Sequence, residues 1–340
     1  MTLQQLKYLL GIVDSGLNIT AAAERLYTSQ PGISRQLKLL EQELGLKLFA
    51  RKGKTLASIT PAGREVIERA RRILQEVDNI RSLADELSAD ESGTLSIATT
   101  HTQARYVLPD IVRAFRERYP KVSLELHQGT SEQIAELVTS QQVDFAIASD
   151  AYRLFTDLVI LPCYRWDRIV LVPQDHPLLE RRDAVDLEAL AAHPLVTYVF
   201  SATGESSFKR AFADRSLNPD VVFTARDADV IKTYVRMGMG VGIVASMAYE
   251  CSDEPELVAL DATGLLPRCT TWLGFPRGAV LRQYTLDFIE LFAGHLTPRR
   301  VREAVEAGER TAIERLFADV ELPLRTGCGP DETAERTSAA

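Results

Sequence analysis

The chain has 340 residues, of which 46% are hydrophobic and 25% are charged, and its formal net charge is −8. This length is enough for two or three domains with hydrophobic cores of their own. No run of about 18 apolar residues is present, which argues against a membrane span. The first residues lack the pattern of a secretory signal and the four cysteines are scattered, so we expect a cytoplasmic protein without a disulfide framework.

Residues 20–49 predict two short helices joined by a tight turn. The first helix covers residues 21–26 and the turn covers residues 27–29. Ser29 is placed to cap the second helix, and Pro31 fits its first turn, where a missing N–H costs nothing. The apolar residues that then recur at helical spacing are Ile33, Leu37, Leu40 and Leu44.

The opposite face of the second helix carries short polar side chains and cations. Groups of this kind reach base edges and phosphates in a major groove. Residues 51–60 (RKGKTLASIT) follow, and the basic residues around Gly53 predict a hairpin-like wing. The residues expected to contact DNA are Thr28, Gln30, Pro31, Ser34, Arg35, Lys38, Arg51 and Lys54.

The charge distribution favours DNA binding over the alternative, an ordinary helical hairpin with a solvated polar face. Residues 1–60 hold eight Lys and Arg against four Asp and Glu, whereas the whole chain is at −8. A basic head on an acidic body is typical of a nucleic-acid-binding module joined to another domain. Residues 1–59 are therefore expected to form a winged helix-turn-helix domain that binds double-stranded DNA.

Residues 60–89 predict one long linker helix. Its apolar residues are spaced alternately four and three apart, which makes a heptad seam on an otherwise polar surface. We expect this seam to pair with a second copy of the chain; the alternative is that it packs on the chain's own body. The predicted dimer seam consists of Val66, Ala70, Ile73, Val77, Ile80, Ala84 and Leu87.

Strand-like and helix-like segments alternate from residue 93 onward. TLSIA (94–98) precedes one expected helix, and VSLELH (122–127) precedes another. Alternation of this kind predicts a parallel-rich α/β domain, and its length of about 200 residues suits two lobes.

A polar junction follows the first of these strands. Thr99–Gln103 supplies hydroxyl and amide groups at an expected helix start, where free backbone N–H groups favour an anion. No Lys or Arg lies between residues 99 and 104, so neutral dipoles would hold a small oxyanion or a zwitterion. The alternative is a hydroxyl-rich helix cap that binds only water.

Long motifs along the chain resemble those of the LysR-type transcriptional regulators. They include TPAGREVI (60–67), RYPKVSLELHQG (118–129), DFAIAS (144–149) and TARDADVIKTYVRMGMGVGIVASMA (224–248). The resemblance implies a DNA-binding regulator of sulfur-assimilation and cysteine-biosynthesis genes, not an enzyme. A regulator of sulfonate-use genes is the alternative within the family, and an α/β enzyme with a fused DNA-binding head is the alternative from another class.

The resemblance also implies an architecture. Two Rossmann-like lobes, as in periplasmic binding proteins, would comprise residues 93–163 with 270–295 and residues 164–269. A C-terminal helix and a disordered tail are expected in residues 296–340, and the disordered part is residues 325–340, which have no apolar periodicity. The chain would form dimers of dimers and contact RNA polymerase.

A small effector would bind between the lobes, namely N-acetylserine, O-acetylserine, sulfate or thiosulfate. The resemblance implies that the effector-binding residues are Thr100, Thr102, Gln103, Ser149, Trp166 and Thr203. Trp166 and Thr203 are expected to contribute from the second lobe. Ser149 stands where the family pattern has Thr, so the pocket would be one methyl group emptier.

No catalytic, metal or cofactor site is expected. The five histidines show no metal-like spacing to one another or to the cysteines. Asp227 and Asp229 lie two apart at an expected helix start, where carboxylates serve as caps rather than as an acid–base pair. The glycines at Gly238, Gly240 and Gly242 follow a helix and precede a strand, which is the reverse of a dinucleotide-binding turn.

Overall fold

The computed structural model describes residues 1–53, 55–87, 92–149, 151–156, 158–199, 206–250 and 254–327. The chain divides into two units, the first comprising residues 1–90 with 279–282 and the second the remainder. Two predicted contact residues, Lys54 and Thr203, lie outside the described residues, as does most of the predicted tail. Among the described residues, no helix is both long enough and apolar enough to cross a membrane.

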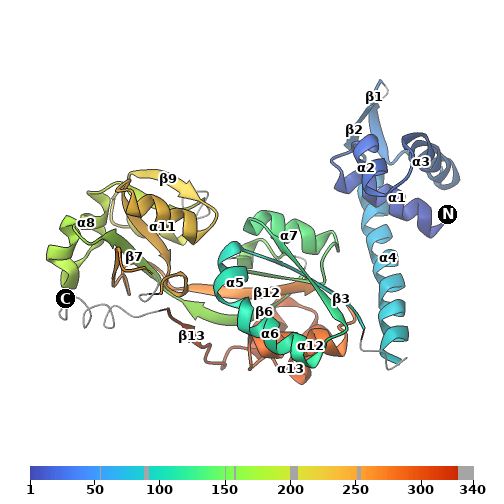
Figure 1. Cartoon of the computed structure of the whole chain (residues 1–340). Coiled ribbons are helices and arrows are strands. Elements are labelled where there is room, and N and C mark those ends of the chain that lie inside the picture. The colour runs from blue at the N-terminus through green and yellow to red at the C-terminus, as the bar shows by residue number, and fades with distance from the viewer. Residues whose placement is uncertain are drawn as a thin grey trace. The chain divides into compact units, whose positions relative to one another are not determined.

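The first unit is a winged helix-turn-helix head with a long helix, as predicted (Figure 1). Its elements are α1 (Leu3–Asp14), α2 (Ile19–Arg25), α3 (Gln30–Leu44), β1 (Phe49–Lys52), β2 (Thr55–Ile59) and α4 (Pro61–Leu87). Thr2, Asn18 and Ser29 cap the first three helices by accepting backbone N–H groups. Gly45 ends α3 at φ +67°, a left-handed conformation that glycine adopts without strain.

The core of the head lies between α3, α1 and the wing. Ile33 and Leu40 of α3 pack in one cluster with Leu6 of α1 and Phe49 of β1, so the predicted apolar face of α3 is the buried one. Glu41 is 3% exposed and accepts the backbone N–H groups of Leu48 (2.9 Å) and Phe49 (3.5 Å). This carboxylate therefore fixes the start of the wing to the end of α3.

In the long helix α4, the first two positions of the predicted dimer seam pack within the head instead of facing a second chain. Val66 and Ala70 pack in the core of the head itself, and Ala70 is only 1% exposed, so these two positions are already covered by their own chain. The later seam positions that are exposed or half-buried are Ile73, Val77, Ile80 and Ala84. The side chain of Leu87 lies outside the described residues. The part of the seam that is open to a second chain therefore begins at Ile73.

The second unit has two lobes, and the first is built on a mixed sheet in the order β13-β6-β12-β5-β3-β4. Its strands are β3 (Gly93–Thr99), β4 (Val122–Gln128), β5 (Phe145–Ser149), β6 (Leu158–Trp166), β12 (Cys269–Pro276) and β13 (Leu324–Arg325). Strands β3, β4 and β5 run parallel, and β12 runs antiparallel to β5 and β6. The helical elements are α5 (His101–Tyr106), α6 (Leu108–Arg118), α7 (Ser131–Thr139), η1 (Ala151–Arg153), α12 (Gln283–Phe292), α13 (Pro298–Ala307) and α14 (Arg310–Leu316).

Helices cover both faces of this sheet, since both faces carry apolar side chains. Ala98 and Ala146 face α7 and pack against its Ile134. On the other face, Phe145 meets Phe288 of α12 with ring centroids 5.7 Å apart. The sheet is thus buried on both sides, as parallel-rich sheets usually are.

The second lobe repeats this arrangement on a sheet in the order β11-β7-β10-β8-β9. Its strands are β7 (Arg168–Pro173), β8 (Leu195–Tyr198), β9 (Val221–Ala225), β10 (Val241–Ala245) and β11 (Leu257–Leu260). Strands β8, β9 and β10 run parallel, and β7 runs antiparallel to β10 and β11. The helical elements are η2 (Pro177–Ala184), α8 (Leu187–Ala191), α10 (Ser207–Ala213), α11 (Ala228–Arg236) and η3 (Ser246–Ala248). The predicted two-lobed α/β fold is confirmed.

The crossover between the lobes lies later than predicted. Strand β6 pairs with β12 as far as Trp166, which lies opposite Cys269, so the chain leaves the first sheet at Asp167 rather than at residue 164. Trp166 therefore belongs to the first lobe and not to the second. A strand's length does not reveal which partner it pairs with, and the pairing with β12 decides the boundary.

The C-terminal segment is also more structured than predicted. After α13 and α14, strand β13 pairs in parallel with the last residues of β6. Gly327 then packs so tightly that a Cβ at this position would lie 2.1 Å from the carbonyl oxygen of Ser246 in the second lobe. Residues 324–327 therefore contact both lobes, although residues from 325 onward were expected to be disordered.

Replacing Glu41 by Ala should destabilise the head, because two buried backbone N–H groups lose their acceptor. The expected loss is about 1–3 kcal/mol in the free energy of unfolding, measured by calorimetry as an earlier melting of the head. Gln42→Ala is the matched control, since Gln42 is exposed on the same turn of α3. Equal melting temperatures for both variants would contradict this role of Glu41.

Candidate functional site

The predicted DNA-contacting residues that the structure describes lie at the surface of the head. Those that are exposed or half-buried are Thr28, Gln30, Pro31, Ser34, Arg35, Lys38 and Arg51. Arg35 and Lys38 form no ion pair with another described residue, so their charges are available to phosphates. In the wing, Gly53 adopts φ +65° at the turn between β1 and β2.

A second candidate site is a pocket between the two lobes of the second unit. It has a volume of about 660 Å³, counted with its open mouth. Its lining residues from the first lobe are Thr100, Thr102, Gln103, Gly129, Thr130, Ser131, Glu132, Ser149 and Trp166, and those from the second lobe are Tyr198, Val199, Arg226 and Ala245. The pocket thus gathers five of the six predicted effector residues, and the sixth, Thr203, lies outside the described residues.

The strand order explains why these residues meet. Strands β3, β4 and β5 of the first lobe and β8, β9 and β10 of the second all deliver residues to the pocket from their carboxyl ends. The carboxyl ends of parallel strands are where ligands bind in open α/β sheets. Two helices, α5 and α7, also begin at the pocket.

Hydrogen bonds through Thr271 join three lining residues, Gln103, Ser149 and Trp166, which form what we call the floor of the pocket. Trp166 donates its indole N–H to Ser149 Oγ at 3.0 Å, and Ser149 Oγ lies 3.0 Å from Thr271 Oγ1. Gln103 donates to Thr271 Oγ1 at 3.5 Å and accepts the hydroxyl proton of Tyr164. Burial raises the pKa of Tyr164, so its hydroxyl stays protonated and remains a donor.

Thr100 differs from these floor residues. It stands at the N-cap position of α5, but its side chain makes no capping hydrogen bond. Its hydroxyl is therefore not used by the helix. Among the predicted effector residues that the structure describes, Thr100 is the one whose hydroxyl is left most available for a ligand.

The charged residues of the pocket were not predicted from the sequence. Arg226 follows β9 and Glu132 follows β4, so the two come from opposite lobes. Both side chains are exposed, and neither forms an ion pair with another described residue. The strand–loop–helix criterion that singled out Thr100 after β3 would have found Arg226, because Arg226 stands between β9 and α11 in the same way.

A polar contact joins α5 of the first lobe to α11 of the second beside the pocket. Asp229 accepts the Tyr106 hydroxyl at 2.5 Å and the Arg105 guanidinium at 3.1 Å, and Lys232 Nζ lies 3.2 Å from it. Burial alone would raise the pKa of Asp229, but the Tyr106 hydrogen bond and the Lys232 charge outweigh burial and hold that pKa below its usual range. Lys232 is 3% exposed and also pairs with Glu254 at 2.6 Å.

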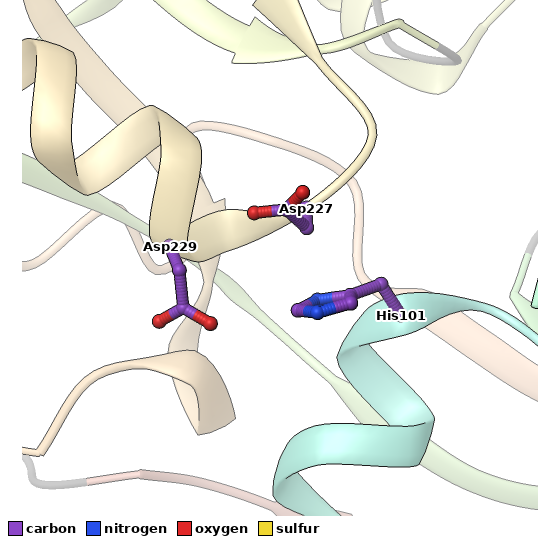
Figure 2. Close-up of side chains that lie close together, drawn as sticks. All are labelled: His101, Asp227 and Asp229. Atoms are coloured by element: carbon purple, nitrogen blue, oxygen red, sulfur yellow. The ribbon is translucent and has the colours of Figure 1, made fainter.

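The same contact brings together three potential metal ligands that the sequence did not predict to meet. Figure 2 shows His101 at the start of α5 facing Asp227 and Asp229 at the start of α11, and their ligand atoms lie within 4.8 Å of one another. Asp227 caps α11 by accepting the Val230 N–H at 2.8 Å, as predicted for a carboxylate at this position. Asp229 already has two cations beside it, which supply the positive charge that a metal ion would bring. We therefore assign the cluster to the contact between the lobes.

Two family comparisons cover most of the chain. Residues 3–64 match the family described as bacterial regulatory helix-turn-helix protein, lysR family, and residues 88–297 match the LysR substrate binding domain. The chain belongs to the LysR family.

Three relatives with known names align over nearly the whole chain. The transcriptional regulator CysB of Haemophilus influenzae is 48% identical over 96% of this chain and all of its own length. SsuR of Burkholderia cenocepacia is 44% identical over 90% of the chain and all of its own length, and Cbl of Escherichia coli is 43% identical over 91% of the chain and 98% of its own length. These relatives are transcriptional regulators rather than enzymes.

Solved LysR structures show the same fold. The cofactor-binding domain of Cbl matches with a TM-score of 0.60 and 44% identity, covering 64% of this chain and 94% of that one. Full-length OxyR of Pseudomonas aeruginosa matches with a TM-score of 0.64 over 87% of this chain and 94% of that one. At 21% identity, the OxyR match supports the fold alone.

Replacing Ser149 by Ala should destabilise the second unit of this LysR-family chain, because the Trp166 indole N–H, in a side chain only 3% exposed, loses its acceptor. We expect a loss of about 1–3 kcal/mol in urea unfolding followed by tryptophan fluorescence. Both tryptophans, Trp166 and Trp272, lie in this unit, so the signal reports on it alone. Ser149→Thr keeps the hydroxyl and is the control; if both variants unfold like wild type, the floor hydrogen bond is unimportant.

Proposed function

We propose that this chain activates genes of sulfur assimilation and cysteine biosynthesis in response to a small effector bound between its lobes. The observation that carries this proposal is the pocket, where five predicted effector residues meet in a chain 48% identical to CysB. A regulator of sulfonate-use genes is the alternative, which the similarity to Cbl keeps open. Titrating the full chain with N-acetylserine, O-acetylserine, sulfate and thiosulfate by calorimetry tests which effector it binds.

The proposed mechanism is a shift between conformations of the two lobes. The pocket has walls from both lobes, so a ligand that contacts both walls stabilises the closed arrangement more than the open one. That difference in affinity is the free energy available to change the assembly on DNA. The head would dock α3 in the major groove with the wing on the adjacent backbone, and the bound protein would contact RNA polymerase.

DNA recognition by α3 predicts two different mutational effects. Arg35→Ala and Ser34→Ala should each weaken binding to a fragment selected by the wild-type protein by about 1–3 kcal/mol. Arg51→Ala should weaken binding to all sequences and lower the slope of affinity against salt by about one. Gel-shift titrations at several salt concentrations measure both effects. Arg69→Ala on α4 is the control and should bind like wild type. Wild-type affinity in Arg35→Ala, Ser34→Ala and Arg51→Ala would refute this docking.

We also propose that the outer part of α4 pairs two chains, in keeping with its exposed apolar residues. Ile73 is 38% exposed and Ile80 is 66% exposed, and they lie seven residues apart on one side of the helix. Pairing would place two copies of α3 on one duplex, as a palindromic operator requires.

The double variant Ile73→Asp, Ile80→Asp should therefore abolish dimers, because it would bury unpaired charges in the interface. Light scattering should show monomers, and binding to the operator should be lost at the same concentrations. The double variant Ile73→Leu, Ile80→Leu is the apolar control and should remain dimeric. An aspartate variant that stays dimeric would show that the seam packs elsewhere.

The pocket proposal predicts that Thr100→Val weakens effector binding, since valine keeps the shape and removes the hydroxyl. Loss of one hydrogen bond lowers affinity by about tenfold, and by up to about a hundredfold where the ligand group at Thr100 is charged, as in sulfate. Calorimetric titration with sulfate and with N-acetylserine measures this loss. Thr263→Val, at an exposed threonine outside the pocket, is the control. If Thr100→Val and wild type bind both ligands equally, the effector site lies elsewhere.

A further inference from the structure

Two opposite charges face the pocket from opposite lobes. Arg226 comes from the end of β9 and Glu132 from the first turn of α7. They are the charged members among the described residues that line the pocket, and neither is engaged in an ion pair with another described residue. The net charge of the described lining is therefore zero, with one cation and one anion available.

The remaining polar lining is neutral, and much of it is already hydrogen-bonded. Ser149, Gln103 and Trp166 are joined through the floor network, and the Tyr198 hydroxyl accepts the backbone N–H of Ala245 at 3.2 Å. Such a floor can hold an uncharged carbonyl or hydroxyl group without any counterion. Charged ligand groups gain most by turning toward Arg226 and Glu132 instead.

We propose that the pocket is built for an α-amino acid with both charges free, whose carboxylate pairs with Arg226 and whose ammonium group pairs with Glu132. This inference rests on the proposed function of the pocket as the effector site. A guanidinium group presents paired donors that match a carboxylate, and a carboxylate accepts the N–H groups of an ammonium ion. The side chain of the ligand would then lie on the neutral floor, next to Thr100.

An inorganic oxyanion fits this arrangement less well. Sulfate would gain the attraction of Arg226 but would also face the like charge of Glu132. An N-acylated amino acid keeps the carboxylate and loses the ammonium, so it would use Arg226 alone. The pair of charges therefore distinguishes three ligand classes by the charges that each one carries.

The experiment compares three probes on the full chain by calorimetry: O-acetylserine, N-acetylserine and sulfate. O-acetylserine is titrated at about pH 6, where both of its charges are present and migration of the acetyl group to nitrogen is suppressed. The variants are Arg226→Gln and Glu132→Gln, and Arg215→Gln is the control for loss of an exposed positive charge elsewhere in the second lobe.

We expect Arg226→Gln to weaken both acetylserines about tenfold, since each loses a charged hydrogen-bond partner. Glu132→Gln should weaken O-acetylserine about tenfold and should weaken neither N-acetylserine nor sulfate, because for these anions it removes a like charge. If Glu132→Gln weakens O-acetylserine and N-acetylserine alike, Glu132 acts on the structure of the pocket and the proposal is wrong. It is equally wrong if neither charge variant changes any affinity.

The Thr100→Val variant tests whether the pocket binds the effector at all, independently of the two charges. If Thr100→Val weakens binding while both charge variants bind like wild type, the pocket holds the effector but the charges do not select it. If wild type binds none of the three probes, both the zwitterion proposal and the effector role of the pocket are overturned.

Discussion

A set of buried hydrogen bonds at the floor of the pocket holds together segments that are far apart in the sequence. Tyr164 of β6 donates to Gln103 of α5, and Thr271 of β12 lies between Gln103 and Ser149 of β5. A buried polar group that loses its partner costs about 1–3 kcal/mol, so these bonds fix α5 against the sheet. Strands β6 and β12 also lead to the second lobe. The shape of the pocket and the path of the chain between the lobes therefore depend on the same few bonds.

Local sequence rules were sufficient to predict the head and the parallel-rich α/β character of the second unit, whereas its two Rossmann-like lobes were implied by the resemblance to the LysR family. The Ser29 cap and the apolar spacing of α3 involve residues within one or two turns of each other, and the structure has both. The burial of Ala70 could not be predicted in the same way. A heptad seam shows that one side of a helix is apolar, but whether α1 or a second chain covers it depends on tertiary packing.

The pocket was predictable in part for the same reason. Thr100, Thr102 and Gln103 stand together at one strand–helix junction, so the sequence alone drew attention to them. Trp166 was assigned to the wrong lobe because its place is set by pairing with β12, about a hundred residues later. Tyr164 gave no signal at all: an aromatic residue in a buried strand is indistinguishable from a core residue until its hydroxyl is seen bonded to Gln103.

The edge strand β13 is synthesised after the strand that it covers. It covers the outer edge of β6 at Arg165 and Trp166, yet it follows the other strands of its sheet in the chain. During synthesis the N-terminal parts of a protein fold first, so the other strands of the sheet leave the ribosome before β13 does. Until then the last residues of β6 present unpaired backbone groups, which are a template for pairing with another chain. The nascent polypeptide therefore presents an unpaired strand edge at the crossover between its lobes until β13 has been made and pairs with β6.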